Sequence, residues 1–312
     1  MSVMVLGATG FIGRRLVLAL AALGLDVVAV SRGGEGPHGV AADRAVPLTI
    51  KTLAGERDTT VVIDLLAYTE ADTLDLLAVL DGHVEHWIMA SSCDVYRNYD
   101  GLHRKADVEP IAESLRETSP LRTTRYPYRL KPRRPAASSD SWMDDYDKIP
   151  LEEAVRARQG LNATILRLPM LYGPGDRQRR FRWIVGPMIA GEKSLRIDPA
   201  WAAWRTTYGY VADVADALAT AARHPAAMGR TFNLGRCDWD HREWVARFAS
   251  VLAWSGKVEE APAPAGSPLA ALDLRFPLAI DTSAFRETCG WREPTQPRDA
   301  ILQTAEDERA RG

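Results

Sequence analysis

The chain has 312 residues, of which 46% are hydrophobic and 26% are charged, as in an ordinary globular protein. Its formal net charge of −2 disfavours a nucleic acid as partner, and no apolar run reaches the roughly 18 residues of a membrane span. Three scattered cysteines fit a reducing compartment, and residues 1–6 form a strand pattern rather than a signal peptide. We therefore expect a cytoplasmic protein that acts without a membrane.

Strand and helix patterns alternate through the first 90 residues. Short apolar runs predict strands at 2–6, 27–30, 61–66 and 87–90, and spaced apolar residues predict helices at 11–23 and 73–80. Buried strands joined by helices are typical of a parallel sheet covered on both faces. The pattern therefore predicts an α/β protein with a doubly wound parallel sheet of the Rossmann type.

Residues 97–140 interrupt this alternation. The segment is rich in Pro, Arg and Ser and has little periodicity, and it is too long for an ordinary connection. We expect either a functional insert or a partly disordered segment. Regular patterns then return, with a helix that ends near residue 159, a strand at 163–168 and a helix at 210–222.

A glycine-rich motif lies between the first predicted strand and the first predicted helix. Gly7 permits a tight turn, Gly10 lets the backbone approach a pyrophosphate, and Gly13 lets helix and strand pack closely. The free N–H groups at the start of the following helix favour phosphate binding. The residues that we expect to bind a dinucleotide here are Gly7, Thr9, Gly10, Phe11, Ile12 and Gly13.

The end of the second strand distinguishes NAD from NADP, because an acidic residue at this place binds the ribose 2′-hydroxyl of NAD. Ser31 and Arg32 follow the motif by about 20 residues, and this pair could instead bind a 2′-phosphate. This favours NADP as the cofactor and leaves NAD open. Asp43, after the region of the third strand, is a candidate contact to the adenine.

Five signals follow one another in the order found in a known superfamily. They are the glycine motif at 7–13, Ser91-Ser92-Cys93-Asp94-Val95-Tyr96, Leu166-Arg167-Leu168-Pro169, Leu171-Tyr172-Gly173-Pro174-Gly175-Asp176 and Gly209-Tyr210-Val211-Ala212-Asp213-Val214-Ala215. Over nearly its whole length the chain resembles the extended short-chain dehydrogenase/reductases, and among them the NAD-dependent epimerase/dehydratase family. The tail with Asp281-Thr282-Ser283, Gly290-Trp291 and Pro294 is also similar to this family.

The resemblance implies two domains with the active site in the cleft between them. Residues 1–170 would form the Rossmann domain, with a basic insert at 97–140. Residues 171–312 would form mainly a smaller α/β substrate domain, with some segments returning to the Rossmann core. It further implies that Leu65, Leu66, Ala67 and Pro169 lie beside the cofactor. The helices at 73–80 and 148–159 occupy positions that form a homodimer interface in the family, so we expect a homodimer.

Catalysis in the family uses a Ser or Thr, a Tyr, and a Lys four residues after the Tyr. Ser92 fits the first position and Lys148 fits the last, but the residue four positions before Lys148 is Asp144. If Tyr146 is instead taken as the Tyr, the Lys position is occupied by Pro150. Residues 146 and 148 of an ideal helix point about 200° apart and cannot share one face. Neither register therefore gives a complete Tyr–Lys pair.

Pro150 fits a helix only near its start, so the helix is expected to begin near Asp147, a residue suited to an N-cap. Tyr146 would then precede the helix and could still point into the cleft. We expect Ser92, Tyr146 and Lys148 to be catalytic, with Lys148 also binding the cofactor ribose. A merely packed Tyr146 is the alternative, and Asp94 or Asp144 would then move the proton.

Arginines gather in two parts of the sequence. Residues 121–135 hold six basic residues and no acid, with Tyr126 and Tyr128 among them, and residues 177–182 hold four arginines. Arginines that converge on a cleft suit phosphate or carboxylate recognition. The substrate-binding candidates are Asp94, Arg129, Arg177, Arg180 and Arg205, and no metal-binding motif accompanies them.

Two hypotheses about function follow. The first is an NAD(P)-dependent oxidoreductase, epimerase or dehydratase that acts on an anionic small molecule by hydride transfer at the nicotinamide. The second is a non-redox Rossmann protein that senses the cofactor, or that binds RNA or a protein partner through the basic insert. The irregular Tyr–Lys segment favours the second hypothesis, whereas Ser92 and the arginines favour the first.

Overall fold

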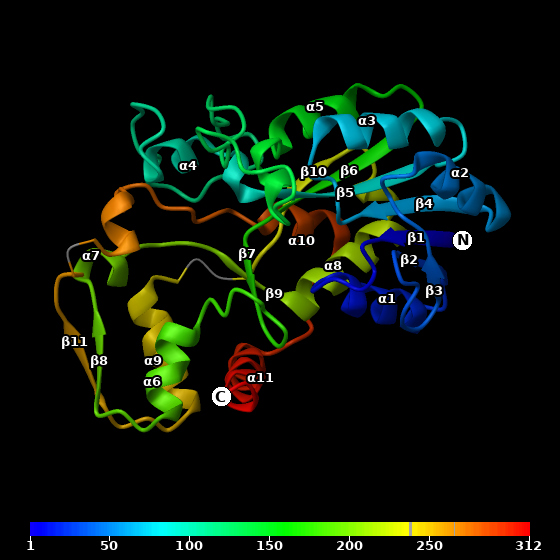
Figure 1. Ribbon diagram of the computed structural model, residues 1–312. Helices are drawn as coiled ribbons and strands as arrows, with labels where there is room; N and C mark the ends of the chain where they lie inside the picture. The colour runs from blue at the N-terminus through cyan, green and yellow to red at the C-terminus, as the bar shows by residue number, and fades with distance from the viewer. Residues whose placement is uncertain (237–238, 265) are drawn as a thin grey trace.

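The computed structural model describes residues 1–236, 239–264 and 266–312, and a sheet of seven strands lies at its centre (Figure 1). The strand order is β10-β6-β5-β4-β1-β2-β3, and all neighbouring strands are parallel. The strands are β1 (Ser2–Leu6), β2 (Asp26–Ser31), β3 (Gly39–Ala41), β4 (Thr59–Asp64), β5 (His86–Ser92), β6 (Asn162–Leu168) and β10 (Thr231–Asn233). The predicted Rossmann-type sheet is thus confirmed.

Helices cover both faces of this sheet. One face carries α2 (Pro47–Glu56), α3 (Glu70–Val79) and α5 (Lys148–Ala157), and the other carries α1 (Gly13–Ala22), α8 (Val211–Arg223) and α10 (Ser283–Cys289) (Figure 1). Two separate apolar cores result, one on each side of the strands. The strands are buried because their side chains on both faces enter one or the other core.

The order of the strands locates the ligand-binding edge of the sheet. From β1 the chain builds outward to β3, and it then returns to place β4 on the other side of β1. In open α/β sheets, ligands bind beyond the carboxyl ends of the strands where the order reverses. The segments that follow β1, β4 and β5 therefore lie at the edge where a cofactor is expected.

A smaller assembly follows β6 along the chain. It holds two pairs of parallel strands, β7 (Met170–Tyr172) with β9 (Tyr208–Tyr210) and β8 (Ser194–Ile197) with β11 (Lys257–Glu260). Its helices are α6 (Arg182–Ile189), α7 (Pro199–Ala202), α9 (His241–Val251) and α11 (Pro297–Ala310). They enclose a separate aromatic-rich core around Phe181, Tyr208 and Trp244. None of the helices in the described residues is long and apolar enough to cross a membrane.

The helix boundaries confirm one prediction and correct two. Asp147 is the N-cap of α5, and its carboxylate accepts a hydrogen bond from the Ile149 N–H at 3.2 Å, as the position of Pro150 predicted. Helix α3 begins three residues earlier than predicted because the Thr69 side chain caps it. The short helix α4 (Arg97–Leu102) was not predicted, since its six residues show no apolar period.

The basic insert is held by ion pairs with acidic residues at its own end. Arg134 pairs with Asp144, and both Arg129 and Arg133 pair with Asp145. Within the described residues, α4 is its only regular element, and the 3-10 turn η2 (Ser141–Asp144) follows directly after it. Three arginines of the insert thus pair with carboxylates a few residues further along the chain, which neutralises part of its positive charge.

Candidate active site

The turn between β1 and α1 has the geometry of a dinucleotide cradle. Gly7 has a φ of +91°, which favours glycine, and its N–H donates to the Val30 carbonyl at 3.2 Å. A Cβ on Gly13 would lie 2.2 Å from the Gly7 carbonyl oxygen, so only glycine fits there. The N-cap residue Ile12 offers no side-chain cap, and the first turn of α1 holds no acid. These residues fit a pyrophosphate bound at the helix N-terminus.

The side chains at the end of β2 carry opposite charges. Arg32 is exposed and has no side-chain hydrogen bond or ion pair among the described residues. The Ser31 hydroxyl donates to the Glu35 carboxylate at 3.2 Å and accepts from the Gly34 N–H at 3.0 Å. A carboxylate thus lies beside the place predicted for a 2′-phosphate, because the glycine-rich loop after Arg32 folds back. The sequence pattern alone did not reveal this role of Glu35.

The segment after β4 lies against the glycine motif. A Cβ on Gly7 would lie 3.0 Å from Leu66 Cγ, so the Leu66 side chain packs closely against the Gly7 backbone. Leu65 and Leu66 are half-buried and Ala67 is buried. Asp43 is exposed, and its carboxylate accepts from the Ala45 N–H at 2.9 Å.

A buried ion pair that the sequence did not reveal anchors this same edge of the sheet. Arg44 donates to Asp64, the last residue of β4, with a shortest N–O distance of 2.5 Å. Asp64 also accepts from the Leu66 N–H at 2.9 Å, which fixes the turn that follows the strand. The pair therefore shapes the backbone next to Leu65 and Leu66.

Three of the predicted site residues meet beyond the end of β5. Ser92 ends the strand, and Asp94 follows in the 3-10 turn η1 (Cys93–Val95). The Tyr146 hydroxyl donates to Asp94 Oδ2 at 3.0 Å, and the Ser92 hydroxyl lies within hydrogen-bonding reach of Tyr146. Tyr146 precedes α5, as expected, and its side chain is 8% exposed. The structure thus places the half-buried Ser92 in one polar cluster with the buried Asp94 and Tyr146.

Lys148, the first residue of α5, reaches the same place from the opposite side. Its Nζ donates to the carbonyl of Ala67 after β4 and, at 2.8 Å, to the carbonyl of Ala90 in β5. Nζ lies 5.4 Å from the centre of the Tyr146 ring. An ammonium group has three donors, so one N–H remains for a ligand. Tyr146 and Lys148 thus lie close together despite their irregular spacing, because Tyr146 lies outside the helix that Lys148 begins.

Burial shifts the pKa of each titratable group in this cluster. Burial lowers the pKa of Lys148 to about 8, against attraction by Asp64 and Asp94. Burial raises the pKa of Asp94, although Arg122 and the hydroxyls of Tyr128 and Tyr146 oppose the effect. Burial and the neighbouring Asp94 carboxylate raise the pKa of Tyr146 well above its ordinary value of 10. Perturbed groups that meet in one cluster are typical of a reactive site.

Aromatic side chains enclose the cluster. Tyr68, just after β4, stacks on Trp142 of η2 with ring centres 4.4 Å apart, and its ring lies 5.3 Å from Lys148 Nζ. Tyr128 of the insert packs edge-on against Tyr146 at 5.2 Å. The insert and the turn that follows it therefore supply two aromatic walls, Tyr128 and Trp142. No sequence pattern had separated these rings from ordinary core residues.

Another buried polar group beside β5 is the Glu152 carboxylate on α5. It accepts from the Ser91 hydroxyl at 2.6 Å and from Arg167 of β6 at 2.7 and 3.0 Å. These hydrogen bonds and the charge of Arg167 lower the pKa of Glu152, although burial opposes them. The network holds α5 onto β5 and β6 and so fixes the helix that begins at Lys148.

The four predicted substrate arginines have separate surroundings. Arg129 donates to the Asp144 carbonyl at 2.8 Å and packs over Tyr126, while Arg180 pairs with Asp176 at 3.0 Å. Arg177 and Arg205 are exposed. Pro169, predicted near the nicotinamide, is buried between β6 and β7. Asp144 accepts from the N–H groups of Leu130 and Arg134, which lower its pKa against the effect of burial, so it serves the insert.

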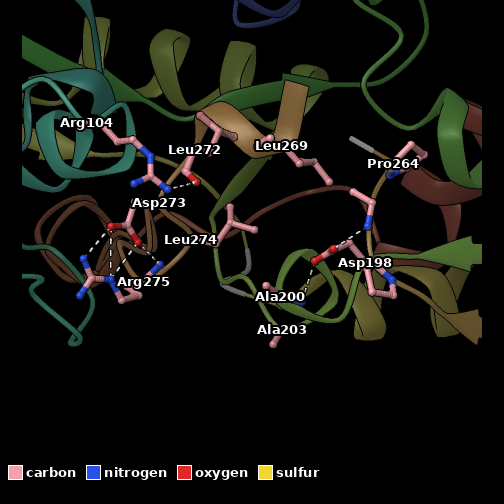
Figure 2. A pocket seen from close by; sticks show the side chains of 13 residues that line it. Arg104, Asp198, Ala200, Ala203, Pro264, Leu269, Leu272, Asp273, Leu274 and Arg275 are labelled. Atoms are coloured by element: carbon pink, nitrogen blue, oxygen red, sulfur yellow. Dashed lines mark hydrogen bonds and ion pairs between the residues drawn. The ribbon is translucent and has the colours of Figure 1, made fainter. Parts of the chain in front are cut away.

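A cavity of about 640 Å³ lies beside the smaller assembly (Figure 2). Arg104, Asp273 and Arg275 line one side, and Asp198 and Pro264 line the other (Figure 2). Leu272 and Leu274 also line it, and they belong to the apolar cluster that includes Tyr99 and Tyr128. Most of its charge is balanced, since Arg275 pairs with Asp273 at 2.7 Å. Two of its leucines thus belong to the same apolar cluster as Tyr128, which packs against Tyr146.

Fold and site together define a dinucleotide-binding enzyme of the extended short-chain dehydrogenase/reductase type. The family model described as "NAD dependent epimerase/dehydratase family" matches residues 3–235, and the chain belongs to this family. Among curated proteins, no sequence matches the chain.

Solved structures share the fold over whole chains. A UDP-glucose 4-epimerase from Thermotoga maritima with UDP-glucose has a TM-score of 0.68 and 19% identity, covering 100% of this chain and 99% of that one. A UDP-glucose 4-epimerase from Thermus thermophilus in complex with NAD has a TM-score of 0.66 and 22% identity, covering 99% of each chain. MoeE5 in complex with UDP-glucuronic acid and NAD has a TM-score of 0.68 and 21% identity, covering 100% of both.

Proposed function

We propose that this enzyme binds a nicotinamide dinucleotide at the β1–α1 turn and interconverts a hydroxyl and a carbonyl group on an anionic small molecule. The observation that carries the proposal is the cluster of the half-buried Ser92 with the buried Tyr146 and Lys148 at the carboxyl ends of β4 and β5. A bound nicotinamide would supply the hydride acceptor or donor. The residues of the chain bind and orient the substrate and move its proton.

Each member of the cluster has a distinct role in this proposal. The hydroxyls of Ser92 and Tyr146 hold the reacting oxygen of the substrate, and Tyr146 exchanges a proton with it. The remaining N–H of Lys148 holds the ribose of the cofactor. Leu65, Leu66, Ala67 and Pro169 pack beside the dinucleotide.

The proposed substrate class is a nucleotide sugar or a similar anionic compound. UDP-glucose and UDP-glucuronic acid are named with two of the structures that share this fold. The exposed Arg177, which has no side-chain ion pair among the described residues, and the exposed Arg205 are the arginines that we propose for the anionic end. The cavity lined by Leu272 and Leu274 is a candidate place for the distal part of a long substrate. Arg129 and Arg180 are weaker candidates than Arg177 because both already pair with acids.

We propose NADP(H) as the preferred cofactor, because Arg32 is free to pair with a 2′-phosphate while Glu35 can turn away from Ser31. Loss of such a charge-assisted pair costs about 1.5–3 kcal/mol, or roughly ten- to a hundredfold in affinity. Titration of the intrinsic fluorescence of NADPH and NADH tests this in wild type, Arg32→Ala and Glu35→Gln. Arg32→Ala should weaken NADPH alone, and Glu35→Gln should strengthen it. Equal affinities for both cofactors in the wild type would refute the preference.

Turnover tests the remainder of the proposal. UDP-glucose and UDP-glucuronic acid, each with NADP⁺ or NAD⁺, are incubated with the enzyme, and products are separated by chromatography so that redox-neutral epimerisation is also detected. We expect turnover of at least one nucleotide sugar, and its loss in Lys148→Met. Cofactor binding without turnover of these or other carbonyl and sugar substrates would instead favour the non-redox alternative.

We also propose that two chains pair through α3 and α5, which lie side by side on one face of the sheet (Figure 1). Of the leucines on α3 and at its end, Leu77 and Leu80 face the protein core, whereas Leu74 is 41% exposed. Leu74 is thus the apolar contact available to a partner. Light scattering at micromolar concentration should give a dimer mass, and a monomer mass would refute the pairing.

A further inference from the structure

Tyr128 reaches the reacting cluster from the basic insert. Its hydroxyl donates to Asp94 Oδ2 at 3.0 Å, the same oxygen to which Tyr146 donates at 3.0 Å. The two rings pack edge-on, so the hydroxyls converge on the carboxylate from different directions. One carboxylate oxygen therefore joins the insert to the proposed proton-transferring residue.

The second oxygen of Asp94 is left without a donor. Oδ1 is buried and has no hydrogen-bond partner among the described residues. The Arg122 side chain, although near, donates to the backbone carbonyl of Asp94 at 2.9 Å and to the Asp147 carboxylate at 2.6 Å. In the part of the chain that the structure describes, Asp94 is thus a buried carboxylate held by two phenols and by no side-chain ion pair. Its charge is poorly compensated, which makes it a good proton acceptor.

The insert holds Tyr128 firmly in this position. Arg134 donates to the Tyr128 carbonyl at 2.9 Å and pairs with Asp144. The Tyr126 N–H donates at 2.9 Å to Asp147, the residue between Tyr146 and Lys148. The arginines of the insert thus fix Tyr128 relative to the segment that carries Tyr146 and Lys148.

We propose that Tyr128 is a positioning residue that keeps Asp94 ionised in the resting enzyme, ready to receive the proton of Tyr146. This inference rests on the proposed function. In the oxidation of a substrate hydroxyl, the O–H proton passes to Tyr146 Oη while the phenolic proton of Tyr146 passes to Asp94 Oδ2. The hydride leaves the substrate carbon for the nicotinamide, and a C=O bond forms. Reduction reverses each transfer, so protons and electrons balance.

The groups around Asp94 decide which way its titration responds. The titratable and charged groups that face it are Cys93 on its own turn, Tyr99 on α4, Arg122 and Tyr128 on the insert, Tyr146 before α5 and Lys148 at its start. Of these, Arg122, Tyr128, Tyr146 and Lys148 favour the ionised form of Asp94. Removal of the Tyr128 hydroxyl should therefore make Asp94 bind its proton more tightly.

The test is a titration of Asp94 that needs no substrate. Protein labelled with ¹³C at the aspartate carboxyl carbons is followed by NMR between pH 4 and 9, and the Asp94 signal is assigned by its loss in Asp94→Asn. Tyr128→Phe removes only a hydroxyl, and a hydrogen bond to a charged group is worth about 1.5–3 kcal/mol. We therefore expect the midpoint of the Asp94 titration to rise by about one to two pH units. Asp94 would then bind its proton about ten- to a hundredfold more tightly.

Tyr126→Phe is the matched control, because Tyr126 lies in the same insert and its hydroxyl has no hydrogen bond among the described residues. Its Asp94 midpoint should equal that of the wild type. If a turnover assay is in hand, the acid limb of the pH profile should move upward in Tyr128→Phe alone. An unchanged midpoint in Tyr128→Phe, or an equal shift in Tyr126→Phe, would overturn the proposal. Failure of every turnover assay would overturn the proposed function but would leave the titration readable.

Discussion

Two buried carboxylates, Glu152 and Asp94, lie within reach of neighbouring serines at the end of β5, and they have opposite surroundings. Glu152 accepts from Ser91 and from the guanidinium of Arg167, and these contacts lower its pKa. Asp94 accepts from two phenols beside Ser92, and burial raises its pKa. One acid therefore stays ionised and holds the fold together, whereas the other binds a proton more readily than an ordinary aspartate.

The comparison indicates how the fold separates stability from chemistry. A bidentate guanidinium satisfies a buried carboxylate and removes its capacity to accept a proton. Phenol donors satisfy the carboxylate only partly and leave that capacity in place. We expect substitutions on the Glu152 side to change stability and substitutions on the Asp94 side to change turnover.

The largest effect is expected for Tyr146→Phe. If Tyr146 exchanges a proton with the substrate, kcat should fall by roughly 10²–10⁴-fold, the usual contribution of general acid–base catalysis. Cofactor affinity should stay unchanged because only a hydroxyl is lost. Turnover of the nucleotide sugar and fluorescence titration with NADPH measure the two quantities. Tyr208→Phe, which loses a buried hydroxyl bonded to His241, is the control and should keep its kcat.

A Tyr146→Phe variant with full activity would contradict this assignment. Tyr146 would then be a packed aromatic, and the proton would have to move by way of Asp94 directly. Glu152 and Asp94 would still differ in their surroundings and pKa shifts, but Tyr146 would have no part in proton transfer.

Glu152→Gln should give the largest loss of stability. Removal of one partner from a buried ion pair leaves Arg167 uncompensated and costs about 3–5 kcal/mol in the free energy of unfolding. Because the folded pKa of Glu152 lies below its ordinary value of 4.5, its stabilisation is present above that pH and is lost as the pH falls through the folded pKa. Urea unfolding should show a large difference in the free energy of unfolding between Glu152→Gln and wild type at pH 7.5 and a smaller one in acid.

The exposed neighbour Glu153 offers a matched control, since Glu153→Gln should leave the unfolding free energy nearly unchanged. Equal stability of Glu152→Gln and wild type at pH 7.5 would show that the network around Arg167 does not hold α5 in place.

Ser91 and Ser92 sharpen the comparison because they are adjacent and chemically identical. Ser91→Ala removes a hydrogen bond to an ionised carboxylate, so it should lower the unfolding free energy by about 1.5–3 kcal/mol and leave kcat nearly unchanged. Ser92→Ala should lower kcat by roughly ten- to a hundredfold with little loss of stability. Unfolding and turnover are measured for both variants. Equal effects, or a loss of kcat in Ser91→Ala and of stability in Ser92→Ala, would contradict the assignment of Ser91 to stability and Ser92 to turnover.

The sequence predicted the course of the backbone better than the contacts of the side chains. Periodicity and the glycine motif predicted the parallel sheet and the dinucleotide cradle, and Pro150 predicted the N-cap at Asp147. These features depend on local sequence, which periodicity and cap rules read directly. The position of Tyr146 outside α5 could also be predicted. A helix that begins at Lys148 does not fix the direction of the side chain two positions before it.

The pairing of charges between segments could not be predicted in the same way. The arginines of the insert were considered without the acids at 140–147, which lie just beyond the arginine-rich stretch and neutralise part of it. Tyr128 was noted only as an aromatic residue among the arginines, and Glu35 was not noted, because their contacts depend on loops that fold back, and such loops have no period. The Arg44–Asp64 pair could not be predicted either, because it joins residues 20 positions apart and no sequence pattern links them.

The smallest expected effect has the opposite sign to that of Glu152→Gln. Because the folded pKa of Asp94 lies above its ordinary value of 3.8, the folded protein binds more protons than the unfolded chain between these two values, and stability falls as the pH rises through that window. Above it the buried charge opposes folding.

Asp94→Asn removes this charge and keeps one carbonyl oxygen to accept from Tyr128 and Tyr146. Its free energy of unfolding at pH 8 should therefore exceed that of wild type by about 1 kcal/mol, while kcat falls. In acid, as wild-type Asp94 takes up its proton in the fold, the unfolding urea concentrations of the two proteins should converge. A variant that is less stable than wild type at pH 8 would mean that the phenols hold Asp94 as a structural ion, as Arg167 holds Glu152.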